Sequence, residues 1–387
     1  MSVLIIGGGQ GGYQTAFSLR AEGYGGSITI VGEEPHLPYQ RPPLSKGLLL
    51  GKQQERHVFL RVAEFYEKQN IRLISGTHVQ SLRETPVSYE WLVLATGARN
   101  RHLTCPGAEH ALYLRTLDES QAVKQRLEAA ASVVVIGGGF VGLEIAAAAR
   151  MLGKDATVIE AQPRLMARVA APEVSQYFRE QHEARGVRVL LNSFVERLEP
   201  NAVILRDETS VQADLIIAGI GVVPNDELAR EAGLAVGNGI SVDEFLRTSN
   251  PHIFAIGDCA EYPSRYADGR VRLESVQNAV DQATCVAKAI CGKPEPYTAA
   301  PWFWSNQFDI QLQTAGLAIG FDQTILRGDP TSNKFSVFYY REGILKAVDS
   351  INQAAEHMTA RKLIAAKANV APDQAADAGF DLKSALL

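Results

Sequence analysis

Cysteine is scarce in this chain of 387 residues, which contains only Cys105, Cys259, Cys285 and Cys291. These residues form no C-x-x-C pair and no cluster with the spacing of metal ligands. A disulfide framework, a zinc site and a protein-held iron–sulfur cluster are therefore not expected, and we predict no metal site.

Long apolar runs are also missing, since no eighteen consecutive apolar residues occur. The formal net charge is −5 and no block of like charge stands out, which argues against nucleic-acid and membrane partners. The chain starts directly with the apolar residues 3–6, without the charged segment of a signal peptide. We expect a cytoplasmic globular protein with two or three domains.

One sequence pattern occurs twice. Residues 5–12 read IIGGGQGG and residues 135–142 read VIGGGFVG. Each copy follows an apolar strand and precedes a helix-like stretch, and a second apolar strand then ends in an acid, Glu33 or Glu160. Each copy therefore predicts a βαβ unit, and the chain is expected to carry two Rossmann-like folds.

The glycines of such a turn have separate tasks. The first makes the turn, the second lets the backbone approach a pyrophosphate, and the third lets the helix pack on the strand. The pyrophosphate then lies at the helix N-terminus, where free N–H groups and the helix dipole favour negative charge. An empty glycine-rich turn is the alternative for either copy.

Glu33 and Glu160 are placed to accept hydrogen bonds from ribose hydroxyls, with a solvated strand end as the alternative for each. A carboxylate at position 160 would repel a 2′-phosphate, which favours NADH over NADPH. Arg164 and Arg168 lie close enough in sequence to weaken that preference.

Three further apolar strands, within residues 91–97, 215–221 and 253–258, each end in a turn. The C-terminal part has alternating and aromatic strands followed by a helical stretch, 354–368. We predict an α/β protein with two Rossmann-like dinucleotide-binding domains and a C-terminal α+β domain. The tail after Pro372 is expected to be loosely held.

Two dinucleotide sites in one chain suggest that one holds FAD permanently while the other exchanges a nicotinamide dinucleotide. The segment LPYQRPPLSK, residues 37–46, resembles the flavin-contacting segment of FAD-dependent, NADH-using ferredoxin reductases of the putidaredoxin reductase type. Further similar segments cover nearly the whole chain: LRTL at 114–117, FVGLE at 140–144, RLMAR at 164–168, GDCA at 257–260, ESVQN at 274–278 and PWFWSNQ at 301–307.

The resemblance implies a set of site residues. Lys46 and Glu144 would form a catalytic charged pair against the flavin ring, with a surface pair as the alternative. The residues implied for FAD are Gly7, Gly9, Gly11, Gly12, Glu33, Arg41, Pro42, Lys46, Val79, Ala95, Thr96, Gly97, Arg115, Asp258, Val276 and Trp304. Those implied for NADH are Gly137, Gly139, Phe140, Val141, Gly142, Glu144, Glu160, Arg168 and Gly221. For Asp258 a turn-capping role is the alternative, and for Trp304 a core position.

The resemblance also implies a domain map. The FAD domain would comprise residues 1–104 and 226–299, the NADH domain 105–225, and the C-terminal domain 300–387 would cover the flavin face. One departure from the family pattern is Asn306, where such reductases often have Asp.

The other departures are two stretches, 78–89 and 194–213, that look shorter than the hairpins of the family and are expected to be trimmed surface loops.

Relatives that reduce disulfides need a cysteine pair to take electrons from flavin, and this chain has none. Relatives that act as NADH peroxidases or oxidases carry one redox Cys where this chain has Lys46. The flavin is therefore expected to pass its electrons outward, or to oxygen. We predict hydride transfer from C4 of NADH to N5 of FAD, followed by two single-electron transfers to a carrier. The resemblance implies a 2Fe-2S ferredoxin serving a haem-thiolate monooxygenase or a ring-hydroxylating dioxygenase, and a monomer or weak homodimer.

Two alternatives stay open. The first is an NADH oxidase or a rubredoxin reductase, which differs only in the electron acceptor. The second is a redox-sensing interaction protein of the apoptosis-inducing-factor kind, which would be expected to have a targeting segment and a basic DNA-binding surface. Neither of those features is visible in the sequence.

Overall fold

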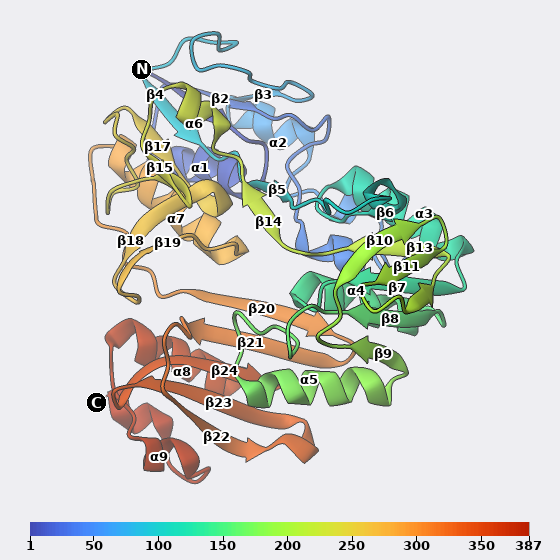
Figure 1. The fold of residues 1–387 in the computed structure, drawn as a ribbon. Helices are drawn as coiled ribbons and strands as arrows, with labels where there is room; N and C mark the ends of the chain where they lie inside the picture. The colour runs from blue at the N-terminus through green and yellow to red at the C-terminus, as the bar shows by residue number, and fades with distance from the viewer. Residues whose placement is uncertain (387) are drawn as a thin grey trace. The chain divides into compact units, whose positions relative to one another are not determined.

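The computed structural model describes residues 1–386. The chain divides into two compact units. Unit 1 consists of residues 1–40, 55–99 and 223–301, and unit 2 of residues 41–54, 100–222 and 302–387. The ribbon of each unit can be followed by colour in Figure 1.

Unit 1 is built on a parallel five-stranded sheet in the order β17-β4-β1-β2-β3. The central strands are almost entirely apolar and buried, as expected where helices cover both faces of a parallel sheet. The sheet strands are β1 Ser2–Ile6, β2 Ser27–Val31, β3 Ile71–Ile74, β4 Trp91–Leu94 and β17 Ile253–Ala255.

The helices of unit 1 include α1 and α7, which pack closely on each other. The helices are α1 Gln10–Ala21, α2 Ala63–Lys68, α6 Glu227–Glu231 and α7 Val276–Ile290. A second sheet has the order β15-β16-β18-β19, formed by β15 Val236–Gly237, β16 Gly239–Ser241, β18 Ala260–Ser264 and β19 Gly269–Val271. The short strands β5 Ala98–Asn100 and β14 Val222–Pro224 pair where the chain leaves unit 1 and where it returns.

Unit 2 repeats the parallel plan in the order β6-β13-β7-β8-β9. Its strands are β6 Ala111–Leu112, β7 Ser132–Ile136, β8 Asp155–Ile159, β9 Val187–Leu190 and β13 Leu215–Ala218. Its helices are α3 Leu117–Ala129, α4 Phe140–Met151 and α5 Pro172–Ala184. The strands and the helix expected for each of the two βαβ repeats are confirmed.

Residues 194–213 are not the trimmed surface loop that the sequence suggested. They form an antiparallel sheet of β10 Val195–Glu199, β11 Ala202–Leu205 and β12 Ser210–Gln212. Its apolar side chains, among them Val203 and Leu205, share one buried cluster with Val134 and Ile216 of the parallel sheet. The hydrophobic face makes this short sheet part of the core. Residues 78–89 contain neither helix nor strand.

The C-terminal part of unit 2 is an antiparallel sheet in the order β20-β21-β24-β23-β22. The strands are β20 Trp302–Gln307, β21 Ile310–Gly316, β22 Gln323–Asp329, β23 Lys334–Arg341 and β24 Ile344–Ile351. The helices that come after it are α8 Ala354–Ala366 and α9 Pro372–Ala376. This confirms the α+β character expected from the alternating pattern.

Side-chain alternation places α5 and α8 on opposite faces of this sheet. The rings of Phe335 in β23 and Tyr177 in α5 are 4.9 Å apart, whereas Ser336 bonds to Glu356 of α8 at 2.6 Å. Successive residues of a strand point to opposite faces, so α5 covers one face and α8 the other. Figure 1 shows both helices beside the sheet.

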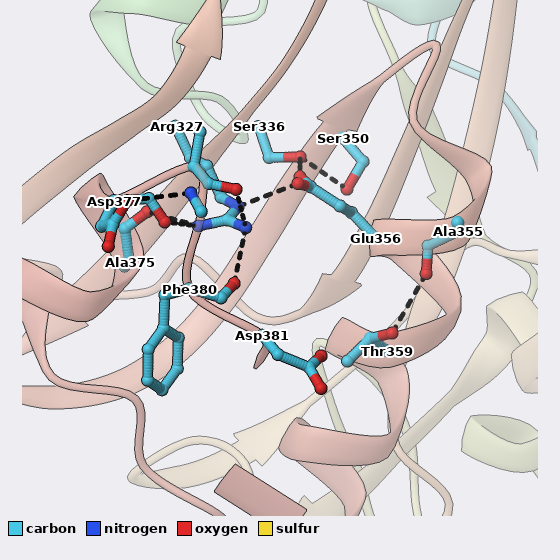
Figure 2. A network of polar contacts seen from close by, with 12 residues as sticks. Arg327, Ser336, Ser350, Ala355, Glu356, Thr359, Ala375, Asp377, Phe380 and Asp381 are labelled. Atoms are coloured by element: carbon cyan, nitrogen blue, oxygen red, sulfur yellow. Dashed lines mark hydrogen bonds and ion pairs between the residues drawn. The ribbon is translucent and has the colours of Figure 1, made fainter. Parts of the chain in front are cut away.

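Among the described residues, the tail after Pro372 packs on the C-terminal sheet through α9, so the expectation that it is loosely held was wrong. The Arg327 guanidinium, 5% exposed as a residue, bonds to Glu356 at 2.8 Å and donates to backbone carbonyls of the tail. Those carbonyls belong to Ala375, Asp377, Ala378 and Phe380. Figure 2 shows this network. A buried arginine needs several acceptors, and the turns of the tail provide them.

Candidate functional site

The first glycine turn, between β1 and α1, leaves no room for side chains at two positions. A Cβ added to Gly7, whose φ is +123°, would lie 2.1 Å from the carbonyl oxygen of Ala95. A Cβ added to Gly12 would lie 1.9 Å from the carbonyl oxygen of Gly7. These contacts hold helix, turn and neighbouring strand at backbone distance, which is the packing the sequence predicted.

The second glycine turn, between β7 and α4, has the same construction. A Cβ on Gly137, whose φ is +108°, would lie 2.4 Å from the carbonyl oxygen of Gly219, which comes directly after β13. A Cβ on Gly142 would lie 2.1 Å from the carbonyl oxygen of Gly137. The repeat found in the sequence is therefore a repeat of backbone packing.

The middle glycine of each turn is different, because no protein atom lies within 4 Å of a Cβ built on Gly9 or Gly139. Each of these residues is the N-cap of a twelve-residue helix, α1 or α4, and neither helix N-terminus is capped by a side chain. Free backbone N–H groups beside an open glycine fit the pyrophosphate of a dinucleotide. The residues present therefore fit two dinucleotide cofactors.

The acids after the second strands are placed differently in the two repeats. Glu160 comes directly after β8, and its carboxylate accepts from the N–H of Gly138 at 2.6 Å and of Gln162 at 2.8 Å. In the first repeat the residue after β2 is Gly32, and Glu33 comes one residue later. The Glu33 side chain is 73% exposed and lies 3.1 Å from the His78 ring.

The two arginines near Glu160 are not equivalent. The Arg164 guanidinium bonds to the carbonyls of Ala167 and Ala170 and to Ser175, so it holds its own loop together. Arg168 is exposed, and its guanidinium is the nearest atom to a Cβ built on Gly221, at 3.5 Å. Only Arg168 is placed to reach a ligand at this turn.

Lys46 and Glu144 form the charged pair expected from the sequence. The Lys46 Nζ lies 2.7 Å from Glu144 Oε2, with the side chains 21% and 5% exposed. Lys46 comes directly after the 3-10 turn Pro42–Ser45, and Glu144 lies in α4 just after the glycine turn. Both belong to unit 2.

The segment 41–54 is attached to unit 2 by further bonds. The Arg41 guanidinium donates to the carbonyl of Arg115, and Ser120 in α3 donates to the carbonyl of Leu44 at 3.0 Å. Of the residues predicted for FAD, Arg41, Pro42, Lys46, Arg115 and Trp304 lie in unit 2 and the others in unit 1. Their contacts with FAD stay a prediction.

Among the unit 1 residues, Thr96 is held by two hydrogen bonds to Asn225. The Thr96 hydroxyl donates to the backbone carbonyl of Asn225 at 2.6 Å, and the side-chain amide of Asn225 donates to the backbone carbonyl of Thr96 at 2.8 Å. Gly97 has a φ of +66° and accepts from the Asn225 N–H at 2.9 Å. Asp258 lies in the 3-10 turn after β17, and Val276 starts α7. Val79 is buried, and Ala95 comes directly after β4.

In unit 2 the aromatic residues at the second turn are held by β20. The Phe140 ring contacts the Phe303 ring at 4.7 Å, while Val141, the next residue, is 43% exposed. Trp304 is partly buried, with its ring 5.6 Å from that of Trp302. An exposed valine at the open helix end offers an apolar surface for a ligand ring.

Residues 1–386 contain neither a disulfide nor a group of side chains with the arrangement of metal ligands. All four cysteines are free, and burial raises the pKa of the Cys285 thiol to about 11. No three His, Cys, Asp or Glu side chains in this range form a group that could hold a metal ion. No helix in the same range is long and apolar enough to cross a membrane.

Sequence reasoning missed the polar residues around Glu144. Ser45 donates to its carboxylate at 2.5 Å and Ser305 at 2.6 Å. Behind Ser305 stand Gln307 and the fully buried His182 of α5. Ser45, Ser305 and Gln307 lie inside the quoted motifs, but a neutral side chain gives no signal of its own in a single sequence.

Family comparison agrees with this geometry. The profile described as "Pyridine nucleotide-disulphide oxidoreductase" matches residues 1–283, and the profile "Reductase C-terminal" matches residues 302–386. The chain belongs to the pyridine nucleotide-disulphide oxidoreductase family. It is a flavoprotein oxidoreductase that uses FAD and NAD(P)H, which confirms the cofactor classes predicted from the two glycine turns.

Two curated relatives match the chain over nearly its whole length. Rhodocoxin reductase of Rhodococcus erythropolis is 45% identical over 403 residues, covering 100% of this chain and 94% of that protein. A rubredoxin-NAD(+) reductase of Pseudomonas putida is 40% identical over 369 residues, covering 91% of this chain and 96% of that protein.

Two solved structures match over the whole chain. The ferredoxin reductase for the CYP199A2 system of Rhodopseudomonas palustris is 45% identical, with a TM-score of 0.97 and 100% of both chains covered. The reductase in a covalent putidaredoxin reductase–putidaredoxin complex is 39% identical, with a TM-score of 0.96, covering 100% of this chain and 98% of that chain. The family resemblance carried by the sequence motifs is confirmed.

Proposed function

We propose that this protein is an NADH-dependent ferredoxin reductase that carries electrons through FAD to a 2Fe-2S ferredoxin serving an oxygenase. The proposal rests on three observations: two open glycine turns, a partly buried Lys46–Glu144 ion pair, and the lack of a redox dithiol. Two solved reductase structures match the whole chain, one of a ferredoxin reductase and one of a complex with putidaredoxin, which supports the choice of partner.

The turn at Gly9 is assigned to FAD and the turn at Gly139 to NADH. The motif segments that resemble flavin-contacting sequence begin near the first turn, and Glu160, beside the second, carries the charge that rejects a 2′-phosphate. This assignment gives the domain map: residues 1–104 and 226–299 for FAD, 105–225 for NADH, and 300–387 as the C-terminal domain.

The Lys46–Glu144 pair is assigned to the flavin ring. Bound FAD would supply the chemistry of the reaction, which is hydride acceptance from the nicotinamide and release of single electrons. The Lys46 ammonium supplies a fixed positive charge that favours reduced over oxidised flavin. Glu144 holds that ammonium at 2.7 Å, so the charge keeps a defined position. Both residues would act by orientation and electrostatics, without moving a proton.

The electrons that reach the flavin need an acceptor outside this protein. The described residues contain no cysteine pair and no metal cluster that could receive electrons, so the electrons leave the protein. A small iron–sulfur carrier accepts single electrons, as the second half of the reaction requires. We infer a monomer or weak homodimer in the cytoplasm, a compartment in which free thiols such as these persist.

The test is steady-state electron transfer to a panel of acceptors, using the FAD-loaded protein and NADH. We expect rapid reduction of at least one 2Fe-2S ferredoxin, slow reduction of rubredoxin and little oxygen consumption. Fast rubredoxin reduction would instead make the protein a rubredoxin reductase. Fast oxygen consumption without any reduction of a 2Fe-2S protein would make it an NADH oxidase.

A further inference from the structure

Glu144 is held by more than its partner lysine. Its Oε2 atom accepts from Lys46 at 2.7 Å and from Ser45 at 2.5 Å, and its Oε1 atom accepts from Ser305 at 2.6 Å. The carboxylate is 5% exposed, so water cannot replace a lost donor easily. Two neutral hydroxyls therefore fix both oxygens of the group that positions the lysine.

Ser305 belongs to a longer chain of hydrogen bonds that crosses from β20 to α5. The Gln307 amide nitrogen donates to Ser305 Oγ at 3.3 Å, and the Gln307 carbonyl oxygen lies 2.8 Å from His182 Nε2. Ser305, Gln307 and His182 are each 1% exposed or less. Both Ser305 and Gln307 point to the same face of β20, as alternate residues of a strand must.

His182 determines which group donates in each hydrogen bond of this series. Burial lowers the pKa of His182 to about 4, so the ring is neutral at physiological pH. Its Nδ1 has no bonding partner among the described residues, which suits the tautomer with the proton on Nε2. That proton requires the Gln307 oxygen as acceptor, and the amide then presents its N–H to Ser305.

A serine hydroxyl has one proton to give. Because Ser305 accepts from Gln307, its proton is left for Glu144. If the amide of Gln307 were turned around, its oxygen would compete with Glu144 for that same proton. The buried histidine, three hydrogen bonds away, therefore decides whether Glu144 keeps its third donor.

We propose that Ser305, Gln307 and His182 form a positioning relay that fixes the Glu144 carboxylate and, through it, the charge of Lys46. The proposal rests on the proposed function, in which this ion pair lies against the flavin. The relay residues act through Glu144 rather than by touching a cofactor. Loss of the relay leaves the carboxylate less compensated, so its negative charge counts for more and the bound flavin becomes harder to reduce.

The first experiment compares Ser305→Ala with Ser305→Thr in the FAD-loaded protein. The readouts are the midpoint potential of the bound flavin and the stopped-flow rate of its reduction by NADH. Ser305→Ala should disfavour two-electron reduction about tenfold, a shift of roughly 30 mV to more negative potential. Ser305→Thr keeps the hydroxyl and fits a strand, so it should restore the potential.

The second experiment uses non-additivity. Gln307→Met and His182→Phe should each shift the potential in the wild-type background, but neither should add to the shift in a Ser305→Ala background. Tyr177→Phe is the matched control, because Tyr177 is a buried residue of the same helix whose hydroxyl bonds to Asn333 at 2.8 Å, off the relay. It should leave the potential unchanged.

The outcomes separate the relay from the proposed function. If Glu144→Gln shifts the potential while Ser305→Ala and Gln307→Met do not, the relay is refuted and the site stands. Shifts that simply add, or that Tyr177→Phe reproduces, would reduce the three residues to packing and would also refute the relay. If Glu144→Gln itself leaves the potential and the reduction rate unchanged, the ion pair is not at the flavin, and both proposals fail.

Discussion

The two glycine turns share one backbone plan and differ in the residues after their second strands. In both turns, a Cβ on the first glycine would meet the carbonyl of the residue directly after a neighbouring strand, and a Cβ on the last glycine would meet the carbonyl of the first. A Cβ on the middle glycine would meet no protein atom. After the second strand, however, unit 1 has Gly32 where unit 2 has Glu160. Glu33 comes one residue later and is exposed, while Glu160 bonds to the N–H of Gly138 inside its own turn.

This difference separates the general from the specific part of a dinucleotide site. The glycine packing is dictated by backbone contacts and is therefore the same in both repeats. The position of the acid can vary, and the two positions suit different tasks. An acid inside the turn can discriminate between exchangeable ligands. An exposed acid can contact a bound cofactor without stabilising the turn. Matched substitutions in the two turns can test this division.

Replacing the last glycine of either turn should have the largest effect. A Cβ at Gly12 or Gly142 would lie 1.9 Å or 2.1 Å from a backbone carbonyl oxygen of the same turn. Gly12→Ala and Gly142→Ala should each lower the free energy of unfolding by on the order of 4 kcal/mol, or prevent folding. Thermal unfolding of the purified variants, or their yield as soluble protein, measures this.

Equal loss in both variants supports the shared plan. A normal unfolding temperature for either one would mean that this turn can open, and that the close packing is not required there.

Replacing the middle glycine should spare the fold and separate the cofactors. Gly9→Ala and Gly139→Ala meet no protein atom, so both proteins should unfold at nearly the wild-type temperature. Gly9→Ala should be purified with little FAD, because its methyl group occupies the pyrophosphate cradle. Gly139→Ala should keep FAD and show a KM for NADH raised roughly tenfold or more, about 1.4 kcal/mol of binding.

The flavin absorbance of the purified variants and NADH titrations decide this point. If Gly139→Ala lost FAD and Gly9→Ala kept it, the cofactor assignment of the two turns would have to be exchanged.

The sequence was informative wherever a residue type has one physical use. The glycine repeat predicted both βαβ units, because a turn of this kind tolerates no other residue at Gly12 or Gly142. The pairing of Lys46 with Glu144, residues 98 positions apart, came from motif resemblance and is present at 2.7 Å. Hydrophobic periodicity and motif spacing in a single sequence do not predict a contact between two residues so far apart.

Other features depend on tertiary contacts that leave no local trace. The tail after Pro372 looked loose because nothing in its own sequence anchors it; the anchor is Arg327, on a strand far upstream. Residues 194–213 looked shorter than the hairpin of the family, yet they form a sheet whose apolar side chains, such as that of Val203, lie in a buried cluster. The relay from His182 to Glu144 uses neutral side chains whose roles appear only when strands and helices are in place.

Acid should destabilise unit 2 through His182. Burial lowers the pKa of this histidine from 6.5 to about 4 in the folded protein, so the unfolded chain binds the proton more readily. The stability that comes from keeping this ring neutral is therefore fully present above pH 6.5. It is lost as the pH falls from 6.5 to about 4, by about 3 kcal/mol in total.

His182→Gln keeps a donor for Gln307 but cannot titrate, so the variant should lose less stability than the wild type over that interval. Urea unfolding at pH 7 and pH 4.5 measures the difference. Parallel loss of stability in both proteins would show that other groups, such as carboxylates, account for the acid sensitivity of the fold.

The smallest effect should come from the two acids, and here the repeats should part most clearly. Glu160→Gln removes the negative charge beside the second turn while keeping an acceptor for the Gly138 N–H. The ratio of kcat/KM for NADH to that for NADPH should therefore fall about tenfold, the equivalent of about 1.4 kcal/mol. Glu33→Gln, the matched change in unit 1, should leave that ratio unchanged and weaken only FAD retention. The exposed Arg168 is the group able to override Glu160, and Arg168→Gln in the Glu160→Gln background should remove any affinity gained for the 2′-phosphate. If Glu160→Gln left the coenzyme ratio unchanged, the carboxylate would be a cap for its own glycine turn alone, and the two acids would differ in position without differing in function.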